Sequence, residues 1–185
     1  MYWYKKTKFA VIALAITAFS YACSSESTEA NKQVNTQLNI PAFFAKEITA
    51  LQKRNPEVVK TVKKDSISET KTVHIENWTN ELASFAAVDL NKPAYAGFLK
   101  KDSVAGLVTY TSTKPSLDIK SVQIKYTSEG ELSELRMEKQ VENLLYRTEE
   151  TLIYFPNKRY QLEKKQHVLL LGDKYYHIAG DINPS

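Results

Sequence analysis

The sequence predicts an α+β protein: an antiparallel β-meander of about seven strands, curved, with two N-terminal helices packed on one face. The first observation is the long run 117–182, in which apolar and polar residues alternate between short turns. The second is composition, because 11 Tyr beside only 5 Gly and 6 Pro in 185 residues favour strands joined by short turns. The third is a pair of earlier segments whose apolar residues recur at helical spacing. A single α+β domain over residues 39–185 is therefore expected.

The N-terminal residues 1–22 have the three parts of a signal peptide. Three lysines form a basic start, an apolar stretch covers residues 9–19, and small residues precede Cys23. The apolar stretch is shorter than the roughly 20 residues that a transmembrane helix needs. We therefore predict export and cleavage rather than a membrane span.

Cys23 is the only cysteine, and it follows Ser20-Tyr21-Ala22, an arrangement that resembles the lipobox of bacterial lipoproteins. The resemblance implies that Cys23 becomes the mature N-terminus and is acylated, with palmitate as an expected fatty acid. An ordinary secretory signal with an incidental cysteine is the alternative, since Ser20 stands where a branched aliphatic residue is usual. A single cysteine also forms no internal disulfide, so the core alone must hold the domain together.

Residues 23–38 are predicted to be a flexible lipidated tether, because Ser, Thr, Asn, Gln and Glu dominate this segment and little of it can be buried. The membrane, reached through the lipid anchor, is one expected partner. Ser24 replaces the aspartate that retains some lipoproteins at the inner membrane. The expected location is therefore the cell envelope at the outer membrane, with the periplasmic and surface leaflets both open.

The formal net charge of +4 does not indicate a nucleic-acid partner. Lys5, Lys6 and Lys8 lie in the predicted signal peptide, and without these three the 25 Lys and Arg fall to 22, against 21 Asp and Glu. The remaining charges interleave along the predicted strands, as they do on solvated faces. Binding to nucleic acid is therefore excluded from the expected functions.

Two segments ahead of the meander are predicted helices that cover the sheet. The first begins near Pro41, which suits a first helical turn, ends at Arg54 before a second proline, and directs Phe44 toward the sheet. The second is capped by Asn77 and ends near Asp89. Its apolar stripe consists of Trp78, Leu82, Phe85 and Ala86. Residues 57–75 between the helices are rich in β-branched residues and predict a hairpin.

The turns set the expected register of the strands, which begin with 95–100 and 107–112. A four-residue loop at 128–131 places Ile124 opposite Leu135, Lys125 opposite Glu134 and Tyr126 opposite Ser133. A tight turn at 142–143 places Val141 opposite Leu144. The turn around 156–158 places Leu152 opposite Leu162, Glu150 opposite Lys164 and Leu144 opposite Leu170. A two-residue turn at 172–173 places Val168 opposite His177.

Polar residues interrupt the apolar face of the predicted sheet, where Thr148 lies opposite Gln166, Glu150 lies opposite Lys164 and Lys139 lies near Tyr146. Ligand cavities commonly have such polar groups near their mouth. The alternative is that the strands extend past the helices, so that these groups are simply solvated. The expected ligand is an apolar or amphipathic small molecule held between sheet and helices, with Phe44, Trp78, Phe85, Tyr146, Glu150 and Lys164 as candidate contacts.

The chain is not expected to be an enzyme or to hold a cofactor. It has no Gly-rich phosphate loop, no Gly-x-Ser-x-Gly turn and no His-Glu-x-x-His helix. The predicted turn at 172–173 places His167 and His177 on opposite faces of the sheet, so no metal site is expected. The alternative function is a protein interaction module of an outer-membrane complex, docking through an outer-face patch of Leu145, Leu169 and Tyr176.

Four short segments resemble uncharacterised lipoproteins of flavobacteria and other Bacteroidota: NWTNEL at 77–82, DLNKP at 89–93, NLLY at 143–146 and YFP at 154–156. This resemblance covers most of the mature chain and implies no known activity. The order of elements is also similar to the half-barrel carriers of the LolA, LolB and LppX type, which hold acyl chains between a curved antiparallel sheet and helices. That similarity concerns architecture alone and implies no ligand residue.

Overall fold

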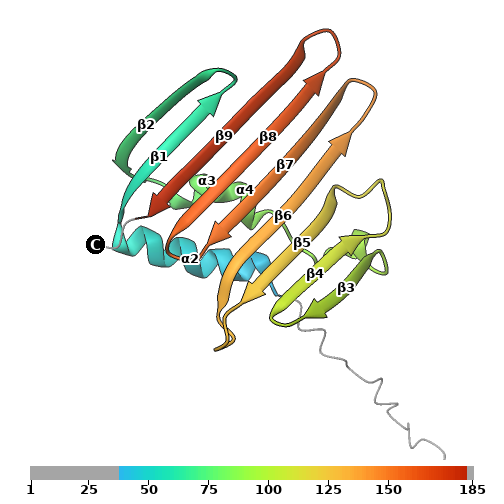
Figure 1. Ribbon diagram of the computed structural model, residues 1–185, viewed down its shortest axis with the longest axis horizontal. Helices are drawn as coiled ribbons and strands as arrows, with labels where there is room; N and C mark the ends of the chain where they lie inside the picture. Colours follow the sequence, from blue (N-terminus) through green and yellow to red (C-terminus); the bar gives the residue numbers. More distant parts are fainter. Residues whose placement is uncertain (1–37, 183–185) are drawn as a thin grey trace, which may run out of the picture. The chain divides into compact units, whose positions relative to one another are not determined.

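The structure, a computed structural model, describes residues 38–182 (Figure 1). The predicted signal peptide, Cys23 and the tether up to residue 37 lie outside the described residues. Residues 37–185 form one compact unit, and the core residues described in it run from Ile40 to Ile182. The unit therefore has a core of its own, and the chain from Ser24 onward should fold without the residues before it. No helix within 38–182 is long and apolar enough to cross a membrane.

Nine antiparallel strands form one sheet, in the order β2-β1-β9-β8-β7-β6-β5-β4-β3 (Figure 1). Their bounds are β1 (Glu57–Lys64), β2 (Ile67–His74), β3 (Leu99–Val104), β4 (Leu107–Ser112), β5 (Ile119–Tyr126), β6 (Leu132–Glu142), β7 (Tyr146–Phe155), β8 (Arg159–Val168) and β9 (Gly172–Ile182). The α+β class, the antiparallel meander and the hairpin β1–β2 are confirmed, but the strand predicted at 95–100 begins four residues later, as β3 at Leu99. The hairpin extends the same sheet, which is neither closed nor strongly curled, so the expected half-barrel curvature is not observed.

The helices lie on one face of the sheet, called here the inner face (Figure 1). Helix α2 (Ile40–Arg54) begins as predicted, with Asn39 Oδ1 accepting a hydrogen bond from Ala42 N at 3.0 Å. The predicted second helix is interrupted at Leu82 and consists of two single turns, α3 (Trp78–Glu81) and α4 (Ala83–Ala86). Asn77 caps α3 as expected, because its side chain accepts from Asn80 N at 2.9 Å. A 3-10 turn, η1 (Pro93–Tyr95), leads into β3.

Aromatic side chains fill the space between the helices and the inner face. The ring centroid of Phe44 lies 5.0 Å from that of Tyr154 on β7, and Phe85 packs against the same tyrosine at 6.0 Å. Trp78 packs edge-on against Tyr160 of β8 at 6.1 Å. These five rings are almost completely buried. The core is therefore close-packed at the point where the helices cross the strands.

Two tyrosine hydroxyls of the sheet form hydrogen bonds to carboxylates of the helices. Tyr154 donates a hydrogen bond to Glu47 of α2 at 2.7 Å. Tyr160 donates to Glu81 of α3 at 2.7 Å, and Lys60 of β1 contacts the other oxygen of Glu81 at 2.7 Å. Burial, together with the neighbouring carboxylate, raises the pKa of both tyrosines far above the ordinary value. Each hydroxyl therefore stays protonated and remains a donor.

The predicted register is confirmed throughout the β7–β8 pair and along most of the β5–β6 pair. All three predicted pairs within β7–β8 that the ladder contains are present, including Glu150 opposite Lys164. In β5–β6, Ile124 lies opposite Leu135 and Lys125 opposite Glu134, as predicted. Tyr126 lies opposite Leu132 rather than Ser133, because a bulge shifts the register at the end of β5.

The predicted register of β6–β7 is wrong by four residues. The turn is closed by a hydrogen bond from Asn143 N to Tyr146 O at 2.9 Å, so Val141 lies opposite Thr148 and not opposite Leu144. A shift of an even number of residues leaves every side chain on its predicted face. The new partners are better matched, because Met137 now lies opposite Leu152.

The predicted register of β8–β9 is wrong by five residues, an odd number that exchanges the faces of β9. The turn consists of residues 169–171, Val168 lies opposite Gly172, and Leu170 lies in this turn rather than opposite Leu144. His167 and His177 consequently share the outer face. Their partners, Asp173 and Glu163, show that the histidines are four residues apart along the ladder, roughly 13 Å. The described residues contain no cluster of three His, Cys, Asp or Glu suited to a metal ion.

Candidate functional site

The helices cover only one end of the inner face, because strands β6 to β9 extend well beyond them (Figure 1). Leu152 and Tyr154 lie under the helices and are completely buried. On the same face and the same strand, Tyr146 lies beyond the helices and is 37% exposed. The inner face thus has one half that the helices cover and bury, and one half that is uncovered and exposed to solvent.

A cavity of ≈ 270 Å³, called here the polar basin, lies on the uncovered half. Strands β6, β7 and β8 contribute its lining residues: Lys139, Val141, Tyr146, Thr148, Glu150, Lys164 and Gln166. The register explains this grouping, since Glu150 lies opposite Lys139 on one side and Lys164 on the other. Alternation along each strand directs all of these side chains to one face.

One carboxylate in the polar basin is shared by two lysines. Lys139 Nζ lies 3.0 Å from Glu150 Oε2, and Lys164 Nζ lies 3.2 Å from Glu150 Oε1. Only 16% of the Glu150 side chain is exposed, and burial acts to raise its pKa. The hydrogen bonds and positive charges of the two lysines outweigh burial and hold the pKa of Glu150 below its ordinary value. The carboxylate is therefore ionised at neutral pH, and the cluster carries one excess positive charge.

The six predicted ligand contacts separate into two groups. Tyr146, Glu150 and Lys164 come together in the polar basin. Phe44, Trp78 and Phe85 are 0–1% exposed, lie in the core beneath the helices, and do not line the basin. The polar basin therefore lies beyond the helices, whereas these three aromatic residues belong to the packed core. Lys139, Val141, Thr148 and Gln166 complete the basin.

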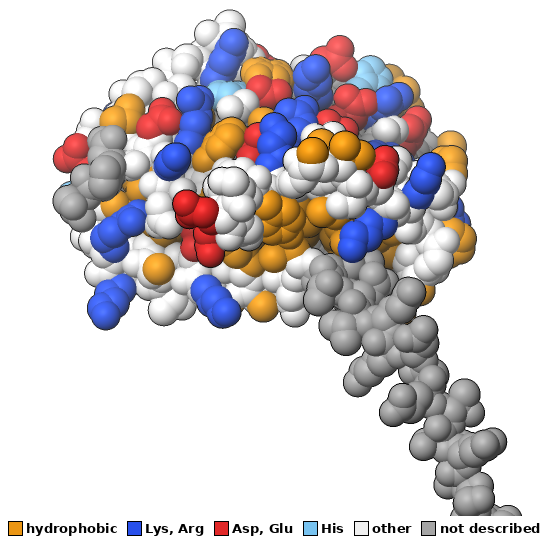
Figure 2. Space-filling view, turned by 60° about the horizontal axis from the view of Figure 1, so that its bottom comes forward, with side chains coloured by type: hydrophobic (Ala, Val, Ile, Leu, Met, Phe, Trp, Pro, Cys, Tyr) orange, Lys and Arg blue, Asp and Glu red, His pale blue; other side chains and the backbone are white. Residues whose placement is uncertain are grey.

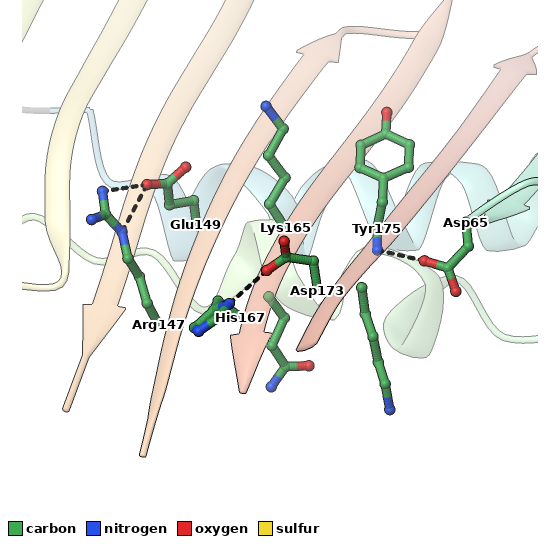
Figure 3. A pocket seen from close by; sticks show the side chains of 9 residues that line it. Asp65, Arg147, Glu149, Lys165, His167, Asp173 and Tyr175 are labelled. Carbon is green, nitrogen blue, oxygen red and sulfur yellow. Dashed lines mark hydrogen bonds and ion pairs between the residues drawn. The ribbon is translucent and has the colours of Figure 1, made fainter. Parts of the chain in front are cut away.

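A second cavity, the outer pocket, lies on the opposite face at the ends of β7, β8 and β9 and has a volume of ≈ 430 Å³. Figure 3 shows two side-chain pairs among its lining residues, Arg147 with Glu149 at 2.6 Å and His167 with Asp173 at 2.6 Å. Both pairs are strongly exposed, and such surface pairs contribute about 0–1 kcal/mol. Because these two pairs are solvated, and none of its carboxylates is buried between two lysines as Glu150 is, the outer pocket is a weaker candidate than the basin.

The predicted outer-face patch is only partly formed. Leu145 and Leu169 lie in neighbouring turns, joined by a hydrogen bond from Leu169 N to Leu145 O at 2.8 Å. Tyr176 lies opposite Lys164, on the inner face, because of the register change in β9. The sequence signal that was missed is the run of three leucines at 169–171, which looks like the end of a strand but forms a turn.

Comparison with known proteins gives no further constraint on the site. No protein-family model, no curated protein and no solved structure matches this chain significantly. The residues of the polar basin themselves are therefore the only guide to its ligand.

Proposed function

We propose that the protein is a non-enzymatic, lipid-anchored protein of the cell envelope that binds an amphipathic ligand in the polar basin. The observation that supports this most directly is the pair Lys139 and Lys164 around the single carboxylate of Glu150. Each ammonium has three donors and uses one of them on Glu150. A carboxylate or phosphate head group would accept the remaining donors and balance the excess charge.

The apolar part of such a ligand has a path beside the lysines. Val141 is 41% exposed and Tyr146 37% exposed, and both line the polar basin. Tyr146 lies opposite Val168, which leads to the exposed leucines of the adjoining turns. A cavity of ≈ 270 Å³ is somewhat smaller than the roughly 300–1,000 Å³ of drug-sized sites, so it fits a head group and a few methylenes. The rest of the chain would lie along this exposed apolar path.

The anchor is the second part of the proposal. The lipobox-like position of Cys23 and the resemblance to flavobacterial lipoproteins support acylation, and the location proposed is the outer membrane. The compact unit 37–185 supports a folded domain separate from the anchor. A protein interaction module is the alternative function.

Substitution of Cys23 tests the anchor. Cys23→Ser should abolish the diacylated N-terminal peptide in mass spectrometry and weaken the association of the protein with the membrane fraction, because two acyl chains supply stable anchoring. Unaltered processing and membrane fractionation of this variant would disprove acylation at Cys23.

Charge substitutions test the polar basin in the chain from Ser24 onward, with a fluorescent fatty acid as the probe. Lys164→Ala should weaken binding about tenfold, since a hydrogen bond to a charged group contributes about 1.5–3 kcal/mol. Glu150→Gln should strengthen binding, because it removes the carboxylate that competes for both lysines. The matched control is Lys125→Ala on the outer face, where Lys125 pairs with Glu134 at 2.6 Å.

Native mass spectrometry of the same chain from an envelope extract should detect a bound amphiphile. Absence of any uptake, or equal losses from Lys164→Ala and Lys125→Ala, would remove the proposed ligand site. Weaker binding in Glu150→Gln would show that the ligand is not anionic.

A further inference from the structure

Two neighbouring turns at one end of the sheet carry exposed leucines. These two turns are called here the leucine tips. The β6–β7 turn contributes Leu144 and Leu145, and the β8–β9 turn contributes Leu169, Leu170 and Leu171. Leu144 is 95% exposed and Leu170 is 96% exposed. Both turns project from the same end of the sheet, at the top of Figure 1. Figure 2 turns the opposite end, the bottom of Figure 1, toward the viewer, and there hydrophobic side chains lie among many charged ones.

Leu170 adopts a backbone conformation that disfavours leucine. Its φ is +70°, in the left-handed region that glycine occupies freely and that a side chain with a Cβ occupies under strain. A side chain that is 96% exposed makes almost no packing contacts that offset this strain. Folding therefore gives no reason for leucine at this position, and the strain points to a functional role.

We propose that the leucine tips insert into the surface of a phospholipid bilayer. A segment that enters lipid loses hydrogen bonds to water, which costs least where its backbone donors are satisfied within the protein, and three of the five leucine amides of the tips have such a partner. In the first tip, Asn143 Oδ1 accepts from Leu145 N at 2.8 Å and from Tyr146 N at 3.0 Å. Between the tips, Leu169 N donates to Leu145 O at 2.8 Å. In the second tip, Leu171 N donates to Val168 O at 3.0 Å.

The residues behind the tips suit the head-group region. Tyr146 follows Leu145 directly and is 37% exposed, and tyrosine is enriched where one end of a side chain is apolar and the other is wet. Arg147 and His167 come next, paired with Glu149 and Asp173. Because the guanidinium of Arg147 is already paired with Glu149, insertion depends on the leucines and needs no anionic lipid.

The shape of the tips favours a bilayer over a protein partner. A stable protein interface needs about 800 Å² of fitted surface on each partner. Five leucines on two narrow projecting turns offer no flat surface of that kind, whereas a bilayer accepts projecting side chains without shape complementarity.

The proposed anchor and the leucine tips can reach one membrane. Strand β7 has 10 residues and a length of about 33 Å. The 15 residues from Ser24 to Leu38 span at most about 50 Å when extended, which is longer than β7. This joint arrangement rests on the proposed lipid anchor, but insertion of the tips does not.

Flotation with phosphatidylcholine vesicles tests the insertion, with the chain from Ser24 onward so that no acyl chain contributes. The chain should float with the vesicles, and addition of phosphatidylglycerol should change the bound fraction little. The combined substitutions Leu144→Ser and Leu170→Ser should lower the partition coefficient about tenfold or more, since each removes an apolar side chain that the bilayer would bury. The matched control is Val104→Ser, because Val104 is 64% exposed in the β3–β4 hairpin at the other end of the sheet.

Leu170→Gly separates this role from folding. Glycine relieves the strained φ, so the midpoint of thermal unfolding should stay the same or rise while vesicle binding falls. Failure of the unsubstituted chain to float, or equal losses in the leucine variants and Val104→Ser, would overturn the proposal. Concentration-dependent self-association without flotation would instead assign the tips to a second copy. Lys164→Ala should leave flotation intact, which distinguishes this surface from the polar basin.

Discussion

Replacing Leu152 with aspartate should unfold the domain or lower its free energy of unfolding by about 4 kcal/mol or more. Leu152 is 0% exposed and lies on β7 between Met137 of β6 and Leu162 of β8. The substitution would leave a carboxylate without a partner among apolar side chains and would also leave a cavity. Since small domains are stable by only about 5–15 kcal/mol, a large part of the population should be unfolded. Urea denaturation followed by circular dichroism measures this loss.

Lys125→Ala is the control for this prediction. Lys125 lies on the outer face, half exposed, and pairs with Glu134 at 2.6 Å. Loss of a surface pair of this kind should change the free energy of unfolding by less than about 1 kcal/mol. Comparable midpoints for the two variants would show that the inner and outer faces have been assigned the wrong way round.

The register that was predicted best is the one with two independent constraints. Around the β7–β8 turn, apolar pairing of Leu152 with Leu162 and ionic pairing of Glu150 with Lys164 required the same alignment. Pro156 and Asn157 also mark this turn clearly, and Asn157 adopts a positive φ of 58°. A strand pair with a marked turn and matched charges can thus be aligned from sequence alone.

The β6–β7 and β8–β9 turns were misplaced because leucines occupy them. Leu144 and Leu170 continue the alternation of their strands, so the apolar pattern assigned them to the ladder although both lie in turns. In β6–β7 the error was even and left the faces correct. In β8–β9 the error was odd and moved Tyr176 to the opposite face. Turns are usually polar, and exposed leucines in them are unusual. The leucines that caused the register errors are the same ones for which we propose a function.

The candidate site was also predicted only in part, because some of its contacts depend on the misplaced β6–β7 turn. The pair Glu150 and Lys164 followed from the correct β7–β8 register, whereas Lys139 could be placed opposite Glu150 only once the β6–β7 register was known. Phe44 and Phe85 could not be assigned to ligand or core from sequence, because an apolar helical stripe is the same in both cases. Only the packing of their rings on Tyr154 decides for the core.

Gly180→Ala should have the second large effect, a loss of about 3 kcal/mol in the free energy of unfolding. Gly180 lies on β9 directly opposite Tyr160 of β8, and a methyl group at Gly180 would overlap the ring of that tyrosine. Tyr160 is 1% exposed, packs on Trp78 and donates a hydrogen bond to Glu81 at 2.7 Å. Alanine would therefore displace the ring that holds α3 on the sheet. Thermal and urea unfolding measure the loss.

A double-mutant cycle shows whether this steric overlap is the cause. In a Tyr160→Ala background the ring is gone, so Gly180→Ala should then change the free energy of unfolding by less than about 1 kcal/mol, the usual range of β-propensity. Strong coupling between the two substitutions is thus the expected result. An equal loss in both backgrounds would mean that Gly180 is required for its backbone and not for the space it leaves to Tyr160.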